Sequence, residues 1–206
     1  MGVLGGTLDP IHVGHLAAAN AAINALNLDE VLIVPAGQPW QKDGRVFANA
    51  PDRLTMASLA TADNPRLTVS DVDVRRPGPT YTVDTLIDVR REEPPSKWWF
   101  IVGADAFVNL PTWHQAERLG GLATFAVVPR TGISQTAIDQ TRERMQSLAA
   151  PVQVDLVSMP EVKVSSSQVR ELIACGEAID NLVPPSVADY ISQHGLYAKS
   201  PAQVAS

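Results

Sequence analysis

Residues 5–15 read GGTLDPIHVGH, and they join two segments of different character. Residues 1–4 form a short apolar run typical of a strand, and the alanine-rich residues 16–26 are typical of a helix. Backbone N–H groups at the start of a helix lack partners, and the helix dipole favours negative charge there. A strand, a glycine turn and a helix start together therefore predict a site that binds an anion such as a phosphate.

Two histidines, His12 and His15, stand three residues apart at the expected helix start. Side chains with this spacing share one face of a helix, and Gly14 between them leaves room for a ligand near the backbone. An imidazole that donates a proton suits nucleotidyl transfer, in which charge builds on the α-phosphate and on departing pyrophosphate. Two other interpretations stay open: a tight turn with two surface histidines, or a pair of metal ligands. The metal interpretation has little support, because the chain holds only two further histidines and one cysteine.

The composition predicts a globular protein that binds neither nucleic acid nor membranes. Its 206 residues are 45% hydrophobic and 18% charged, which is enough for one sizeable core. The net charge of −6 and the absence of long basic runs argue against nucleic acid. No apolar run approaches the roughly 20 residues that span a bilayer, and a strand at the N-terminus leaves no room for a signal peptide. Cys175 is the only cysteine, so we expect a cytoplasmic protein in which this thiol is buried.

Strand-like and helix-like segments alternate along the chain. After the first strand, we expect strands at residues 31–34, 67–74, 98–102, 124–128 and 152–157. We expect helices at residues 16–26, 54–62, 83–91, 135–148 and 169–174. This alternation predicts an α/β fold, a doubly wound (Rossmann-like) parallel sheet with helices on both faces. We expect one domain over residues 1–198 and a frayed tail over residues 199–206.

In a sheet of this kind, ligands bind beyond the carboxyl ends of the strands, where residues 5–15 would lie. The segment 36–50 is unusually long for a loop, and it carries Trp40 and Lys42. An aromatic side chain in a polar loop usually covers something, so we expect this segment to cover the site. A plain surface excursion is the alternative.

A second phosphate-binding element is expected near residue 165. Ser165 and Gln168 fit a capping box, which makes Ser165 the N-cap of a helix. Ser166 and Ser167 would then lie in the first turn and Arg170 one turn later, all able to face a phosphate. An ordinary capped surface helix explains the pattern equally well.

Other polar residues follow expected strands. Gly103 and Asp105 come after the strand at 98–102, where a carboxylate commonly reaches ribose hydroxyls, although a helix cap is a close alternative. Trp113 could equally be a core residue. Thr80 to Thr82 precede a helix and could simply cap it. Arg130, after the strand at 124–128, is by default a solvated arginine.

The run GGTLDPIHVGH resembles the GGTFDPIHxGH signature of the nicotinate-nucleotide adenylyltransferases, with Leu8 in place of phenylalanine. Its HxGH core is shared by a wider superfamily of nucleotidyltransferases and class I aminoacyl-tRNA synthetases, so it indicates chemistry rather than substrate. Four further segments resemble family motifs: 164–170 (ISSTxIR), 103–113 (GxDxxxxxxxW), 80–82 (SYT) and the closing 182–197 (LVP…YI…GLY), which we interpret as packing.

Two motifs depart from the family. The RPG segment has Thr131 after Arg130, and the lid segment PPHK reads PWQK at 39–42. Gln41 can form hydrogen bonds but never carry charge, so any role of the family's histidine at that position is in doubt here. Lys42 can still attract phosphate as a flexible point charge.

The resemblance implies transfer of an adenylyl group from ATP to nicotinic acid mononucleotide, which gives deamido-NAD and pyrophosphate in a step of NAD biosynthesis. It implies that His12, His15 and Lys42 are catalytic. The implied ATP-binding residues are Gly5, Gly6, Thr7, His12, His15, Gly103, Asp105, Ser166 and Arg170. The implied mononucleotide-binding residues are Thr7, Lys42, Tyr81, Thr82, Trp113 and Arg130.

We expect Mg²⁺ to be held mainly by substrate phosphates, with no metal-ligating side chains. A homo-oligomer is compatible with the sequence. The alternatives are the same chemistry on nicotinamide mononucleotide or phosphopantetheine, or an inactive nucleotide-binding regulator.

Overall fold

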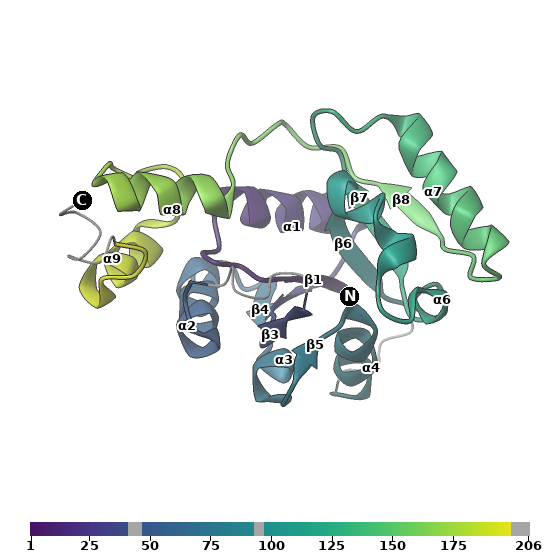
Figure 1. Ribbon diagram of the computed structural model, residues 1–206, viewed down its shortest axis with the longest axis horizontal. Coiled ribbons are helices and arrows are strands. Elements are labelled where there is room, and N and C mark those ends of the chain that lie inside the picture. The colour runs from purple at the N-terminus through teal and green to yellow at the C-terminus, as the bar shows by residue number, and fades with distance from the viewer. Residues whose placement is uncertain (41–46, 93–96, 199–206) are drawn as a thin grey trace, which may run out of the picture.

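A central parallel sheet organises the protein (Figure 1), for which the computed structural model describes residues 1–40, 47–92 and 97–198. Its strands are β1 (Gly2–Gly6), β2 (Val31–Pro35), β4 (Leu67–Val69), β6 (Trp99–Gly103), β7 (Thr124–Val128) and β8 (Val154–Leu156). They lie in the order β4-β2-β1-β6-β7-β8, and all the pairings are parallel. The chain therefore winds outward from β1 in one direction and then from β6 in the other, which creates a switch point between β1 and β6.

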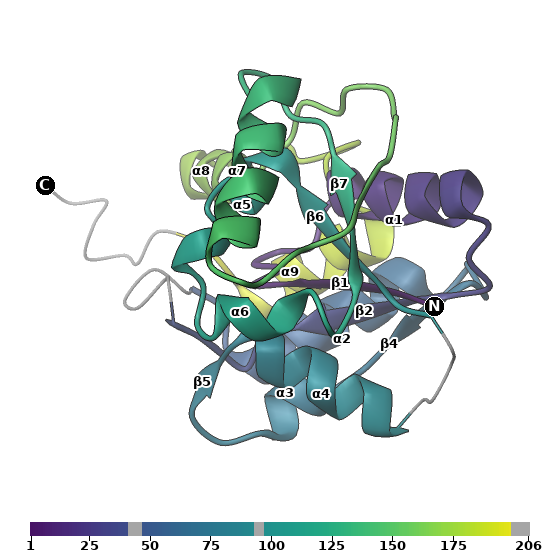
Figure 2. The same ribbon diagram turned by 90° about the vertical axis from the view of Figure 1, so that its right-hand side faces the viewer.

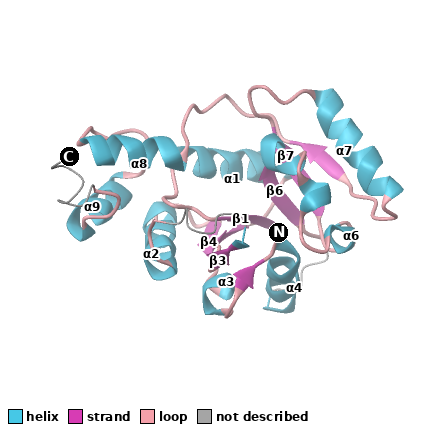
Figure 3. Ribbon diagram, in the orientation of Figure 1, coloured by secondary structure: helices cyan, strands magenta, loops and turns pink. Residues whose placement is uncertain are grey.

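Helices cover both faces of this sheet, as Figures 2 and 3 show. One face packs on α1 (Val13–Leu26), α2 (Ala50–Thr61), α8 (Ser166–Cys175) and α9 (Pro185–His194). The other packs on α3 (Val72–Arg75), α4 (Thr82–Glu92), α5 (Ala104–Phe107), the 3₁₀ turn η2 (Leu110–Thr112), α6 (Ala116–Leu119) and α7 (Gln135–Ser147). Successive strand residues enter opposite cores: Val3 faces the second and Leu4 the first. The expected doubly wound α/β fold is thus confirmed.

One expected strand is wrong over half of its length. The strand expected at residues 67–74 ends at Val69, and the chain then forms the short helix α3. The strand β4 lies at the sheet edge and pairs only with β2, through Ile33 and Val69 at its last register position. Once that partner is lost, Val72 turns into the second core, whereas Leu67 packs in the first.

Other differences concern helix ends and short elements. The helix expected at 54–62 already begins at Ala50, because Asn49 caps it and a proline is tolerated in its first turn. The helix expected at 169–174 spans Ser166–Cys175. Cys175 is exposed rather than buried, since α8 fully buries only Val169. The helix α9 and a two-stranded sheet, β3 (Gln38–Pro39) with β5 (Pro79–Thr80), were not expected.

Within the part of the chain that the structure describes, no helix is both long and apolar enough to cross a membrane. The tail expected at residues 199–206 lies outside the described residues.

A buried arginine forms hydrogen bonds to the loops that follow β1 and β2. Arg53 on α2 is 1% exposed, and its guanidinium donates to the carbonyl oxygens of Ala48 at 3.2 Å, Thr7 at 2.7 Å and Gly37 at 2.9 Å. Thr7 follows β1 and Gly37 follows β2, so one side chain pairs backbone groups at the ends of two neighbouring strands. A buried carbonyl without a partner is costly, so this arrangement determines where both loops lie.

We predict that Arg53→Met destabilises the protein by about 3 kcal/mol, because three buried carbonyl groups lose their charged donor. Urea unfolding followed by circular dichroism measures the change. Arg142→Met is the control: Arg142 faces Asp139 across an exposed 3.7 Å ion pair on α7, so its loss should cost at most about 0.5 kcal/mol. Equal unfolding midpoints for the two variants would contradict the role given to Arg53.

Candidate active site

A cavity of about 990 Å³ opens at the carboxyl ends of the strands, beside the switch point. Its lining includes these candidate residues: Gly5, Gly6, Thr7, His12, His15, Thr82, Gly103, Asp105, Trp113, Arg130, Ser166 and Arg170. Tyr81 is the exception, since its ring packs between Trp40 and His114. Lys42 and Gln41 lie outside the described residues. The structure thus brings together every described candidate except Tyr81, whose ring contacts two residues that line the cavity.

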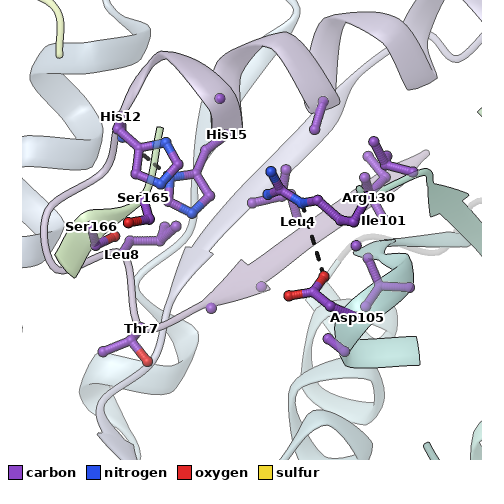
Figure 4. Close-up of a pocket in the computed structure, with 18 of the residues that line it drawn as sticks. Leu4, Thr7, Leu8, His12, His15, Ile101, Asp105, Arg130, Ser165 and Ser166 are labelled. Carbon is purple, nitrogen blue, oxygen red and sulfur yellow. Dashed lines mark hydrogen bonds and ion pairs between the residues drawn. The ribbon is translucent and has the colours of Figure 1, made fainter. Parts of the chain in front are cut away.

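The two histidines lie at the start of α1 with stacked rings, whose centroids are 3.7 Å apart (Figure 4). His12 is the N-cap residue, in extended conformation, and its backbone N–H donates to Nδ1 of His15 at 3.2 Å. Because Nδ1 of His15 accepts this bond, a neutral His15 carries its proton on Nε2. The expected proximity of the two imidazoles is confirmed.

His12 is 3% exposed, and burial lowers its pKa to about 4, with a further contribution from the positive charge of Arg130. The imidazole is therefore neutral at pH 7. Its Nδ1 is buried and has no hydrogen-bond partner among the described residues. A Cβ on Gly14 would come within 2.9 Å of Cγ1 of Val164 and 3.1 Å of the His12 ring. Gly14 itself lines the cavity, and a side chain there would also crowd Val164 and the His12 ring.

The N-terminus of α8 forms the wall beside the histidines (Figure 4). Ser165 caps the helix as expected, since its Oγ accepts from the backbone N–H of Gln168 at 3.1 Å. The Ser166 hydroxyl donates to the carbonyl of Pro10 at 2.9 Å. Arg170 donates to the carbonyl of Asp9 at 2.7 Å, and its guanidinium lies 4.5 Å from the centre of the Phe47 ring. These contacts fix α8 against residues 9–10 and hold Arg170 at the cavity.

Asp9 is a buried residue that accepts several hydrogen bonds, and the sequence pattern did not single it out. Its carboxylate accepts from the backbone N–H groups of Phe47 at 2.8 Å and Ala48 at 3.1 Å, and from the Tyr197 hydroxyl at 2.8 Å. Burial and the charge of Asp9 raise the pKa of Tyr197, which therefore stays protonated and donates. The closing segment thus packs, as expected, and the bond from Tyr197 joins it to the loop before the histidines.

Asp105 and Arg130 face each other on the opposite side of the cavity (Figure 4). Asp105 lies in the first turn of α5 and Arg130 follows β7, with 3.9 Å between Nε and Oδ1. A Cβ on Gly103 would lie 2.5 Å from Oδ1 of Asp105. The absence of a side chain at Gly103 thus leaves room for this carboxylate beside the end of β6.

Aromatic rings gather at a third part of the cavity, where the β3–β5 sheet lies. Trp113 packs edge-on against Phe100, with centroids 6.1 Å apart, and both line the cavity. Tyr81 stacks on His114 at 4.0 Å and is tilted against Trp40 at 5.7 Å. Trp40 lines the cavity, as expected for a residue that covers the site. We call this region the aromatic end.

Asp73 lines the cavity at the aromatic end and was also missed. It is 2% exposed, its carboxylate accepts from the Thr85 hydroxyl at 2.8 Å, and it pairs with Arg76. Burial raises the pKa of this carboxyl group, which the contacts with Thr85 and Arg76 oppose. Sequence spacing gives no signal for this cluster, because Asp73 and Thr85 belong to different helices. Arg53 did leave a signal, since it stands on the same helical face as the core residues Met56 and Ala57.

No group of three or more His, Cys, Asp or Glu side chains among the described residues is arranged to hold a metal ion. Two carboxylates that line the cavity have other partners: Asp105 faces Arg130, and Glu161 accepts from the Thr131 hydroxyl. The donors around the histidines are instead imidazoles, hydroxyls and a guanidinium, which suit a phosphate chain.

Comparisons with known proteins agree with this geometry. The profile of the cytidylyltransferase-like family matches residues 3–172. A protein of Dehalococcoides mccartyi, described as a probable nicotinate-nucleotide adenylyltransferase, is 41% identical over 199 residues, which cover 96% of this chain and 97% of that protein. A protein of Acidothermus cellulolyticus with the same description is 44% identical over 97% of this chain and 95% of its own length.

A solved structure shares the fold. It is that of the Plasmodium falciparum nicotinic acid mononucleotide adenylyltransferase complexed with NaAD, with a TM-score of 0.77 at 19% identity over 95% of this chain and 96% of that chain. The sequence relatives, which match almost end to end, identify the family. This chain therefore belongs to the cytidylyltransferase-like proteins and, among them, to the nicotinate-nucleotide adenylyltransferases.

Proposed function

We propose that this protein transfers the adenylyl group of ATP to nicotinic acid mononucleotide, forming deamido-NAD and pyrophosphate in NAD biosynthesis. The observation that carries the proposal is the stacked pair of His12 and His15 at the start of α1, inside a cavity at the switch point of a doubly wound sheet. A nucleotide binds at this place in such folds, and two adjacent imidazole donors suit the charge of a reacting phosphate.

The triphosphate lies between the N-termini of α1 and α8 in this proposal. Both helices begin at the cavity, so their dipoles supply positive potential although the net charge of the chain is −6. Arg170 adds a permanent charge, and Lys163 from the segment before α8 also lines the cavity. Locally converging positive groups let an acidic protein bind two anionic substrates.

The acceptor base lies at the aromatic end. The half-buried Trp113 and the rings around Tyr81 offer flat apolar surface, which suits a planar pyridine ring better than the flexible chain of phosphopantetheine. Asp105 at the other wall is placed to accept from the ribose hydroxyls of the adenosine. The two nucleotides then meet beneath the histidines.

The reaction needs no enzyme nucleophile. An oxygen of the acceptor's 5′-phosphate forms a bond to the α-phosphorus of ATP, and the bond from that phosphorus to the oxygen that bridges to the β-phosphate breaks. The electron pair of the broken bond leaves with pyrophosphate. His12 donates as a neutral imidazole because burial holds its pKa at about 4, and His15 offers Nε2–H. Donors already in place lower the barrier without reorganisation.

Mg²⁺ fits this proposal as a companion of ATP rather than as a resident ion. The described residues provide no cluster of carboxylates for it, so the phosphates and water would hold it. When bound, the ion supplies charge neutralisation on the leaving pyrophosphate.

The direct test measures pyrophosphate release by the purified protein with ATP, Mg²⁺ and one acceptor at a time. We expect release with nicotinic acid mononucleotide and much slower release with nicotinamide mononucleotide or phosphopantetheine. Release with phosphopantetheine alone would reassign the substrate. Nucleotide binding without release for any acceptor would instead identify an inactive regulator.

We predict that His15→Ala keeps the fold and loses transition-state stabilisation on the order of 2–4 kcal/mol, or roughly 30- to 1000-fold in turnover, because a donor to the reacting phosphate is removed. Steady-state pyrophosphate release measures the loss. His194→Ala, which changes a histidine that does not line the cavity, serves as the control and should keep full turnover. Near wild-type turnover in His15→Ala would remove the catalytic assignment.

The lowered pKa of His12 predicts a specific dependence of stability on pH. Folding lowers this pKa from 6.5 to about 4, so between these values the unfolded chain binds the additional proton. The contribution of neutral His12 to the free energy of unfolding is therefore fully present above pH 6.5. It is lost as the pH falls toward 4, by up to about 3 kcal/mol.

Urea unfolding across this range should show a steeper loss of stability in the wild type than in His12→Gln, whose side chain stays neutral. His194→Gln is the matched control and should keep the wild-type slope. Parallel curves for the wild type and His12→Gln would show that His12 is not held neutral by the fold.

A further inference from the structure

His114 differs from the other residues of the aromatic end because its side chain is a nitrogen base. The described residues that line this end are Pro39, Trp40, Asp73, Thr80, Thr82, Thr85, Phe100, Trp113 and His114. Among them, His114 alone has a side chain that can carry positive charge. Asp73 is the one carboxylate of that set, and a second negative group entering here would meet its field. A partner for a carboxylate on the acceptor ring is therefore most available at His114.

The ring of His114 is held by neighbours on two sides. Its face stacks on Tyr81, with centroids 4.0 Å apart and planes at 28°. Its Nε2 lies 3.1 Å from Nε2 of Gln115. Charged groups bond to neighbours of this cluster: Arg118 bonds to Gln115, and Asp73, which pairs with Arg76, accepts from Thr85 on α4, the helix that follows Tyr81.

These contacts determine which ring nitrogen carries the proton. Arg118 donates to Oε1 of Gln115, so the amide nitrogen of Gln115 is the atom that faces His114. An amide nitrogen can only donate, so Nε2 of His114 accepts and Nδ1 carries the N–H. Nδ1 is thus left as a donor on a ring that lines the cavity.

We propose that His114 is a specificity-determining residue, which selects an acceptor ring that carries a carboxylate over one that carries a carboxamide. The inference rests on the proposed function and deepens it. A hydrogen bond from Nδ1–H to a carboxylate is charge-assisted, whereas the same bond to an amide oxygen is not. The difference between these two kinds of bond corresponds to about tenfold in selectivity.

The test compares kcat/KM for nicotinic acid mononucleotide and nicotinamide mononucleotide in His114→Phe, which keeps a flat ring against Tyr81 but has no N–H donor. We expect the acid-over-amide ratio to fall about tenfold through a higher KM for the acid, with the KM for ATP unchanged. Calorimetric binding of the acid mononucleotide alone should weaken by a similar factor. His114→Asn, whose amide places an N–H near the position of Nδ1, should recover much of the ratio.

The chain offers a matched control in His194. This ring stacks on Tyr190 with nearly the same geometry, 4.0 Å between centroids and 26° between planes, but does not line the cavity. His194→Phe should leave the ratio unchanged. An unchanged ratio in His114→Phe, or equal losses with both acceptors, would overturn the role of His114 while leaving the proposed function intact. Absence of release by the wild-type protein with either pyridine mononucleotide would instead overturn the proposed function itself.

Discussion

The site depends on two buried side chains that hold the loop after β1 in place. Arg53 donates to the carbonyls of Thr7 and Gly37, and Asp9 accepts from the backbone of Phe47 and Ala48. Loops at a switch point carry many backbone polar groups that the sheet cannot pair, and each must find a partner once buried. Because these two side chains supply the partners, the loop has one position, and the start of α1 follows from it.

This constraint also accounts for the chemistry of the histidines. Residues 9 and 10 accept from Arg170 and Ser166, so the loop brings α8 against the start of α1. His12 is then enclosed, and its low pKa follows from that burial. The result is a neutral imidazole close to two helix N-termini. The helix dipoles favour an anion there although the imidazole itself is uncharged. An acidic chain can thus present positive potential at this cavity.

The aromatic end is built differently, from segments that meet only in the folded protein. Residues 38–39 pair with residues 79–80, and the backbone N–H of Gln38 donates to Oγ1 of Thr80 at 3.1 Å. Tyr81, which follows Thr80, stacks on His114 from a later segment of the chain. Asp73 fastens this region through Thr85. The loop before the histidines and the aromatic end are therefore held by different side chains.

The alternating α/β order and the closeness of His12 and His15 could be predicted from the sequence, because they depend on periodicity and on spacings of a few residues. The sequence also located Ser165 as a cap, a local property. The bonds of Arg53 and Asp73 and the stacking of His114 on Tyr81 could be found only in the folded protein, since Arg53 bonds to Thr7 46 residues away and His114 meets a ring from another part of the chain. Burial likewise made His12 neutral and left Cys175 exposed. Desolvation and long-range contacts exist only once distant segments pack together, so a local sequence pattern does not predict them.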